Sequence, residues 1–169
     1  MEKKLTVLRY FAYSIEILLL FVIQGTPGLM PELFGGKPVL LIAAGLAIAA
    51  FEDETPSIVF GLACGVMCDL AISDSAGFFA VSLTAACYAE SLMFKTVIVR
   101  GFINTMIFDF CVCVVIIGLY FLFFFVFKGY ASPLTYFLNH YLSRIVYTFL
   151  SCIPVYFLNM LFYKKINAG

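Results

Sequence analysis

The chain has few charged residues, a single histidine and no excess of either sign of charge. Of its 169 residues 12% are charged and 64% are hydrophobic, and ten basic residues balance ten acidic ones. Soluble domains carry about twice that charged fraction and are closer to half apolar. The scarcity of charge excludes an ordinary soluble domain, and the missing basic excess gives no indication of nucleic-acid binding.

The positions of histidine and cysteine argue against a zinc site and against a disulfide-linked fold. The lone His140 cannot form a catalytic set by itself, and Cys64-x-x-x-Cys68 has no nearby histidine or second cysteine pair to complete a zinc site. All six cysteines lie inside apolar segments, where cysteine acts as a small hydrophobe. We find no nucleophile–base set, metal triad or phosphate loop. We therefore expect a protein that is not an enzyme and holds no cofactor.

Long apolar runs fill most of the chain and predict an all-α polytopic membrane protein. The mean hydropathy is +1.08, and the length allows a compact bundle of about six transmembrane helices in a single domain, residues 1–169. The expected spans are 5–24, 38–51, 57–72, 76–94, 102–127 and 141–163. The second and third are short, so we expect them to be tilted, re-entrant or buried in the bundle.

Local signals predict several helix ends. Pro38 suits the first turn of the second helix, and Thr55 with Pro56 suits the N-cap and first turn of the third. The acidic run 52–54 is expected to be a solvated turn that favours the positive end of the third helix. Pro154 should kink the last helix by freeing a backbone carbonyl.

The basic residues predict the orientation in the membrane. Seven lie on the side that holds both termini: Lys3, Lys4, Arg9, Lys95, Arg100, Lys164 and Lys165. Three lie on the other side: Lys37, Lys128 and Arg144. Cytoplasmic loops carry the excess of lysine and arginine. The N- and C-termini are therefore expected in the cytoplasm.

The third span has one small face and one large face. Gly61, Gly65 and Asp69 are four residues apart, so they share a helix face, which Cys64 and Cys68 join. The opposite face carries Val59, Phe60, Leu62, Val66, Met67 and Leu70. Small residues let another helix backbone approach closely, and a carboxylate cannot face lipid cheaply. We expect the small face to be a packing surface and this helix to be central.

The intramembrane acids Glu16, Asp69, Glu90 and Asp109 each need a partner, a cavity or a proton. For Asp69 we favour a structural anchor, either paired with Arg144 or capping backbone donors in the turn 73–77. A ligand or proton role is the alternative.

Arg9 and Glu16 lie seven residues apart on the first helix. We expect Arg9 to snorkel to the membrane interface and Glu16 to make a packing contact. Asp109 shares a helix face with Thr105 and Cys113. The candidate packing, partner or pocket residues are Gly61, Gly65, Asp69, Gly77, Glu90, Asp109 and Arg144.

The run from Gly61 to Leu70, followed by Gly77 and an apolar helix, resembles the signature region of the rod-shape-determining MreD family. The basic N-terminus, Lys37-Pro38 and the acidic turn before the third helix are similar too. The resemblance implies a non-enzymatic subunit of the cell-elongation machinery, which regulates lateral peptidoglycan synthesis in the bacterial cytoplasmic (inner) membrane. The implied partners are an MreC-like single-span protein, RodA with its transpeptidase partner, and MreB.

The MreD family is also similar in architecture to the substrate-binding subunits of energy-coupling-factor vitamin transporters, which gives an alternative function. The scaffold interpretation predicts a lipid-facing groove for a partner helix, on the small-residue face of the second helix or the aromatic strip of the fifth. The transporter interpretation predicts a polar extracytoplasmic cavity and a small-residue face on the first helix. Only Ala12 and Ser14 are small there, so that face is poorly formed.

Overall fold

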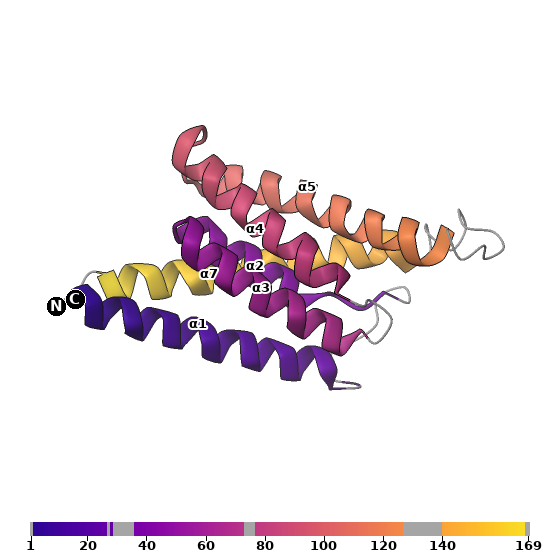
Figure 1. Ribbon diagram of the computed structural model, residues 1–169, viewed down its shortest axis with the longest axis horizontal. Coiled ribbons are helices and arrows are strands. Elements are labelled where there is room, and N and C mark those ends of the chain that lie inside the picture. Colours follow the sequence, from indigo (N-terminus) through magenta and orange to yellow (C-terminus); the bar gives the residue numbers. More distant parts are fainter. Residues whose placement is uncertain (1, 27, 29–35, 73–76, 127–139, 168–169) are drawn as a thin grey trace.

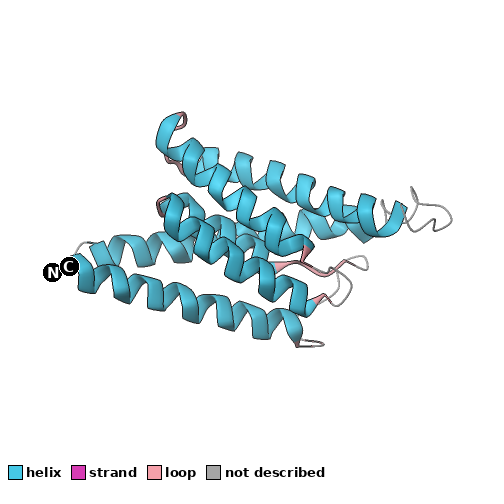
Figure 2. Ribbon diagram, viewed as in Figure 1, coloured by secondary structure: helices cyan, strands magenta, loops and turns pink. Residues whose placement is uncertain are grey.

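The computed structural model describes residues 2–26, 28, 36–72, 77–126 and 140–167, and these form a helical bundle (Figures 1 and 2). The helices are α1 (Glu2–Gly25), α2 (Leu40–Phe51), α3 (Glu54–Ala71), α4 (Phe78–Thr96), α5 (Phe102–Phe121) and α7 (Leu142–Asn167), with a π-helical turn, η1 (Leu122–Val126), after α5. No β-strand occurs among the described residues. The predicted all-α class is confirmed.

Four helices are long and apolar enough to cross a membrane. They contain the segments Lys4–Gly25, Glu54–Ala71, Phe102–Phe124 and Leu142–Lys165. The 19-residue α4 lies outside this set, and α2 is shorter. The two chain ends lie next to each other at one end of the bundle (Figure 1). The helices therefore support a membrane protein.

Helix α2 lies at the centre of the bundle, a place that the sequence assigned to α3. Every residue from Leu40 to Ala50 is buried, and α2 contacts α1, α3, α4, α5 and α7. Its 12 residues span only about 18 Å, against about 30 Å for the hydrocarbon core of a bilayer. A helix this short and apolar on all sides is stable inside other helices. Of the predicted alternatives for the second span, burial in the bundle is the one observed.

The N-terminal end of α2 is capped by side chains from α1 and α7. Gln24 Oε1 accepts a hydrogen bond from the Leu41 N–H at 3.2 Å. Thr148 Oγ1 accepts one from the Val39 N–H at 3.0 Å. The first N–H groups of a helix have no partner within it, and those buried in a bundle need one from elsewhere. Two neighbouring helices thus hold the start of α2.

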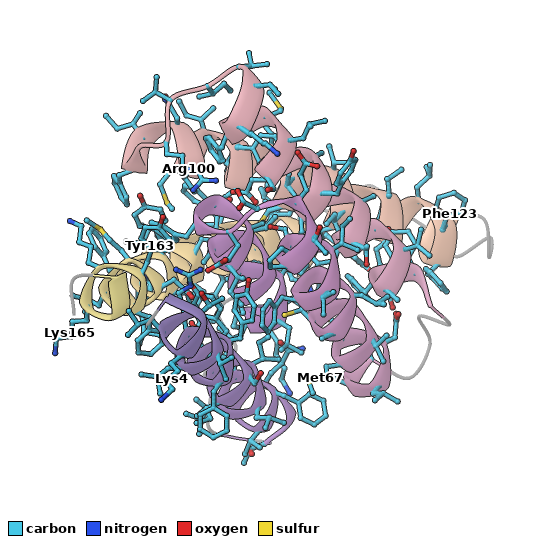
Figure 3. All side chains as sticks on the ribbon, turned by 60° about the vertical axis from the view of Figure 1, so that its left-hand side comes forward. Lys4, Met67, Arg100, Phe123, Tyr163 and Lys165 are labelled. Atoms are coloured by element: carbon cyan, nitrogen blue, oxygen red, sulfur yellow. The ribbon has the colours of Figure 1, made fainter. Side chains whose placement is uncertain are left out.

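The C-terminal end of α2 is held in the same way from the α4–α5 connection. Arg100 donates to the Phe51 carbonyl at 3.0 Å and to the Glu52 carbonyl at 3.4 Å. Ser91 Oγ also donates to the Glu52 carbonyl, at 3.0 Å. Figure 3 shows Arg100 pointing back into the bundle, whereas Lys4 and Lys165 point away from it. A cation at the negative end of a helix is favourable, so Arg100 stabilises α2 as well as adding basic charge.

Two predicted helix starts are wrong by a few residues. Pro38 lies before α2, whose N-cap is Val39, and the Val39 N–H donates to Thr148 Oγ1. The N-cap of α3 is Asp53 rather than Thr55, which leaves Pro56 in the first turn as expected. Pro154, which was expected to kink the last helix, lies inside α7, and the helix continues on both sides of it.

The expected turn 73–75 and the loop 128–139 lie outside the described residues.

Candidate functional site

Gly61 and Gly65 bring α3 into backbone contact with α4. A β-carbon added at Gly65 would lie 2.5 Å from the Phe79 carbonyl oxygen and 2.6 Å from the Ala80 α-carbon. One added at Gly61 would lie 2.9 Å from the Cys87 β-carbon. Real β-carbons do not approach other atoms so closely. The small face is therefore a packing surface, as predicted.

The two faces of α3 differ in burial, except that Phe60 and Met67, which were predicted on the exposed face, are partly buried against the core. Ser57, Gly61, Cys64, Gly65 and Cys68 are the buried residues of the helix. Val59, Leu62, Val66 and Leu70 are exposed large side chains on the opposite face, which lipid would cover in a membrane.

Asp69 caps the first turn of α4. Its Oδ1 accepts a hydrogen bond from the Phe79 N–H at 3.1 Å, and its Oδ2 accepts one from the Ala80 N–H at 2.9 Å. Gly77 is the N-cap residue of α4 with φ of +85°, a conformation that side-chain-bearing residues rarely adopt. The capping alternative predicted for Asp69 is therefore correct in kind, although these donors lie just beyond the turn 73–77.

Arg144 does not form the ion pair with Asp69 that was the other alternative. Its guanidinium carbon lies 5.9 Å from the centre of the Tyr120 ring, a cation–π distance. Within the described part of the chain no ion pair joins Arg144 to an acid. Asp69 already has two N–H donors and needs no cation, so the α3–α4 junction is complete without Arg144.

Arg9 and Glu52 form a buried ion pair, which corrects two predictions. Arg9 Nε lies 2.6 Å from Glu52 Oε1, and Arg9 Nη2 donates to Glu52 Oε2 at 3.0 Å. The Tyr13 hydroxyl also donates to Glu52 Oε1, at 3.2 Å. Arg9 is 9% exposed and Glu52 4%, so Arg9 does not snorkel and Glu52 does not lie in a solvated turn. The pair joins α1 to the end of α2.

Burial has the largest effect on the protonation of Glu52. It raises the pKa of this carboxyl above the ordinary value, while the charge of Arg9 and the hydrogen bonds from Tyr13 and Arg9 act in the lowering direction. Burial raises the pKa of Glu52 more than Arg9 and Tyr13 lower it, so the native state holds the Glu52 proton more strongly than the unfolded chain does.

Glu90 of α4 and Asp109 of α5 form a wholly buried acid pair. Both side chains are 0% exposed, and none of their four carboxyl oxygens receives a hydrogen bond from the described residues. The two carboxyl groups are within hydrogen-bonding reach of each other. A hydrogen bond between two carboxyl groups requires a proton on one of them. The pair is therefore arranged to hold a proton.

Sulfur atoms and small polar groups surround the acid pair. Thr105 and Cys113 are buried on the same face of α5 as Asp109, as predicted. Cys87 of α4 and Cys152 of α7 are also buried near the pair. Among the described residues, no three His, Cys, Asp or Glu side chains converge as metal ligands.

An apolar groove of about 610 Å³ runs between α1 and α7. Its α1 wall consists of Ala12, Ile15, Glu16, Leu19, Leu20 and Ile23, and its α7 wall consists of Ser151, Pro154, Val155, Leu158 and Phe162. Each wall extends over 12 residues, which is about 17 Å along a helix. Leu19 and Leu158 are large side chains exposed on the bundle surface, so the groove opens towards the surrounding lipid.

The Glu16 carboxyl on the α1 wall of the groove is buried and has one oxygen without a hydrogen-bond partner among the described residues. Asn159 Nδ2 donates to Glu16 Oε1 at 2.9 Å and to the Val155 carbonyl at 3.0 Å. Glu16 Oε2 and Asn159 Oδ1 receive no hydrogen bond from the described residues. Glu16 is 6% exposed and Asn159 0%. The predicted packing contact of Glu16 is thus a hydrogen bond that leaves two acceptors unused.

The sequence did not predict that Asn159 bonds to Glu16 or that Arg100 bonds to the C-terminal end of α2. An amide inside an apolar run is a signal that was present, because polar groups in a membrane helix usually face another helix. The role of Arg100 had no local signal, since its partners Phe51 and Glu52 lie about 50 residues away.

Comparison with known proteins gives no relative for this chain: no family model, no curated protein and no solved structure matches it.

Proposed function

We propose that this chain is a non-enzymatic membrane subunit of the bacterial cell-elongation machinery, of the MreD type, which holds the transmembrane helix of an MreC-like partner. The observation that carries the proposal is the apolar groove between α1 and α7. The resemblance of residues 61–77 to the MreD signature supports the choice of machinery.

The groove is long enough to contact about half the length of one transmembrane helix. It is elongated along α1 and α7, apolar except for Glu16 and Ser151, and open on the lipid side. Helices associate in lipid by close van der Waals packing, which a preformed groove provides. The sequence placed the partner on α2 or on the aromatic strip of α5. The small residues of α2 are all buried in the bundle, so α2 cannot receive a partner.

The proposed setting is the bacterial inner membrane, crossed several times, with both termini in the cytoplasm. The seven-to-three distribution of basic residues supports this orientation, and both chain ends lie at the same end of the bundle (Figure 1). RodA with its transpeptidase partner and MreB are the further partners that the resemblance implies. A scaffold of this kind would regulate lateral wall synthesis by holding its partners together.

The geometry supports a helix-binding scaffold better than the alternative, a vitamin-binding transporter subunit. A vitamin site needs convergent polar groups in a concave pocket, and the α1–α7 groove has almost entirely apolar walls. The loops that were predicted to line a vitamin cavity lie largely outside the described residues. The α1 face that would contact a coupling subunit has Leu19 and other large exposed side chains.

Photocrosslinking in living cells tests the proposal. A photoreactive amino acid at Leu19 or Leu158 reports on the groove, and one at Val81, which is exposed on α4, is the matched control. We expect both groove positions to crosslink one single-span protein with an extracytoplasmic domain, and Val81 not to do so. Tight vitamin binding by the purified chain, with no protein adduct from either groove position, would overturn the proposal in favour of the transporter subunit.

A further inference from the structure

An acidic side chain, Glu16, lines the groove between α1 and α7 and bears on what kind of helix can occupy it. Glu16 lies on the groove wall near the middle of the Lys4–Gly25 span, with its Oε2 unpaired. A buried ionised carboxyl without a partner is costly in a membrane. The nearest cation on the same helix, Arg9, is about 10 Å away along the axis and is engaged by Glu52. Whatever fills the groove decides whether Glu16 has a counterion.

Asn159 does not complete the site by itself. Both hydrogens of its amide are used, one by Glu16 Oε1 and one by the Val155 carbonyl. Its Oδ1 is left as a second buried acceptor beside the carboxyl group. With Glu16 ionised, this pair therefore has two unused acceptors and no free donor, and of the two residues only Glu16 lines the groove. A lysine or arginine side chain has several N–H donors and a positive charge, so one such group in the groove can pair with the Glu16 carboxylate.

We propose that the occupant of the groove is a single transmembrane helix of a partner protein with a lysine or arginine at mid-membrane depth, which pairs with Glu16. This inference rests on the proposed function, since it takes a partner helix as the occupant. Charge complementarity selects this occupant over a lipid chain or a second copy of this protein. A lipid acyl chain has no donor. The groove-lining residues of a second copy are uncharged or acidic, so they offer Glu16 no lysine or arginine.

A hollow on the α5 side shows what a groove without this feature looks like. It has a volume of about 330 Å³ and is lined by α5 side chains such as Ile103, Met106 and Phe110, with Phe149 from α7. All of its lining residues are apolar or cysteine. It offers no charged group that would select one partner helix over another.

The test uses the absence of tryptophan from the chain. A Leu158→Trp substitution puts one fluorophore on the groove wall, and Val81→Trp puts one on the exposed face of α4 as a matched control. The full chain is placed in vesicles of phosphatidylcholine with brominated acyl chains, which quench tryptophan on contact. A helix that enters the groove displaces lipid from the first reporter and leaves the second quenched.

Two synthetic helices serve as probes. Each has about 22 leucine and alanine residues, enough to span the bilayer, with a central lysine in one and a central norleucine in the other. We expect the lysine helix to restore the fluorescence of Leu158→Trp at an about 3- to 30-fold lower concentration than the norleucine helix, the range of interhelical polar contacts in membranes. Adding Glu16→Gln to the reporter, which keeps the shape but removes the charge, should abolish this difference.

Three results would overturn the inference. If both helices bind equally well with Glu16 and with Glu16→Gln, the groove binds helices without regard to charge, and the proposed function survives. If neither helix relieves the quenching, lipid occupies the groove. If the reporter is unquenched without any peptide and becomes quenched on dilution into excess lipid, a second copy fills the groove. Failure of the proposed function is separate, because it is seen in cells as the absence of a single-span crosslink from Leu158.

Discussion

The Arg9 guanidinium lies 2.6 Å from the Glu52 carboxylate inside the bundle, and the pair ties α1 to the C-terminal end of α2. Tyr13 adds a hydrogen bond to the same carboxylate, and the Tyr163 ring lies 5.1 Å from the guanidinium carbon. A buried ion pair with α1 thus holds the C-terminal end of the central helix α2 in place. This relationship leads to the first two predictions.

Removing Arg9 should destabilise the protein because it leaves a buried carboxylate without its cation. We expect Arg9→Met to lower the free energy of unfolding by up to about 3–5 kcal/mol at neutral pH. Adding Glu52→Gln should restore most of the loss, because the unpaired charge is then gone. Asp53→Asn is the control, since the Asp53 side chain is 80% exposed and 3.9 Å from Arg100, and it should change stability by less than about 1 kcal/mol. The measurement is unfolding by SDS in mixed detergent micelles. Additive losses in the double variant would contradict the prediction.

The stability of the protein should depend on pH through Glu52. Burial raises the pKa of this carboxyl, so between the unfolded value of about 4.5 and the folded value the native state binds more protons than the unfolded state. The free energy of unfolding should therefore fall as pH rises through this window. Glu52→Gln should reduce the slope, and Arg9→Met should extend it to higher pH, because only the lowering influence is lost. A slope that is unchanged in Glu52→Gln would show that Glu52 is not its source.

Gly65 should tolerate no side chain at all. An alanine β-carbon there meets backbone atoms of Phe79 and Ala80, which cannot move without separating α3 from α4. We expect Gly65→Ala to cost at least about 2 kcal/mol. Gly118 is also inside a helix, but its added β-carbon meets nothing within 4 Å. Gly118→Ala should therefore be neutral or stabilise by up to about 1 kcal/mol. Similar losses in both variants would mean that helix propensity, and not the α3–α4 contact, decides the effect.

Asp69 and Gly65 should be energetically coupled, because both act on the first turn of α4. Asp69→Ala removes two hydrogen bonds to N–H groups that have no helical partner, at a cost of about 1–2 kcal/mol. When Gly65→Ala has already displaced this turn, the loss of Asp69 should cost less. A double-mutant cycle measures the difference, expected at 0.5 kcal/mol or more, about the lower limit for coupled sites. Asp53→Ala is the matched control, since Asp53 is an N-cap without a side-chain hydrogen bond.

The sequence was sufficient for features that depend on local pattern. The helical class follows from long apolar runs, and the close approach at Gly61 and Gly65 follows from small residues spaced by one turn. Capping by Asp69 was one of two sequence alternatives, since the last turn of α3 is separated from the first N–H groups of α4 by a short turn. These features depend on residues near each other in the chain, or on a periodicity that any helix imposes.

The remaining features depend on which helices are neighbours, and the pattern of one chain does not determine that. Arg9 and Glu52 each had a sound local interpretation, as a snorkelling cation and a solvated acid, and the packing of α1 on α2 overrode both. The same holds for Glu16 and Asn159, which are 143 positions apart. Tertiary packing also decides that α2, and not α3, is the central helix, because five other helices pack around α2.

The acid pair Glu90–Asp109 should hold a proton in the folded protein. No Lys, Arg or His of the described chain bonds to the four buried oxygens, and two adjacent carboxylates cannot both be ionised in so apolar a site. Glu90→Gln should cost less than about 1 kcal/mol, because an amide N–H can replace the shared proton. Glu90→Leu should cost about 1–3 kcal/mol, because Asp109 is left without a donor. Unfolding in mixed micelles measures both.

Infrared spectroscopy tests the protonation itself. At neutral pH the carbonyl stretch of a protonated carboxyl should lose intensity in the double variant Glu90→Gln with Asp109→Asn. Glu54→Gln is the control, because Glu54 forms an ion pair with Lys95 at 2.9 Å and both side chains are partly exposed. An unchanged band in the double variant would mean that both acids are ionised in the folded state. Their burial would then require a cation that enters between α4 and α5, because two bare carboxylates repel each other at this depth.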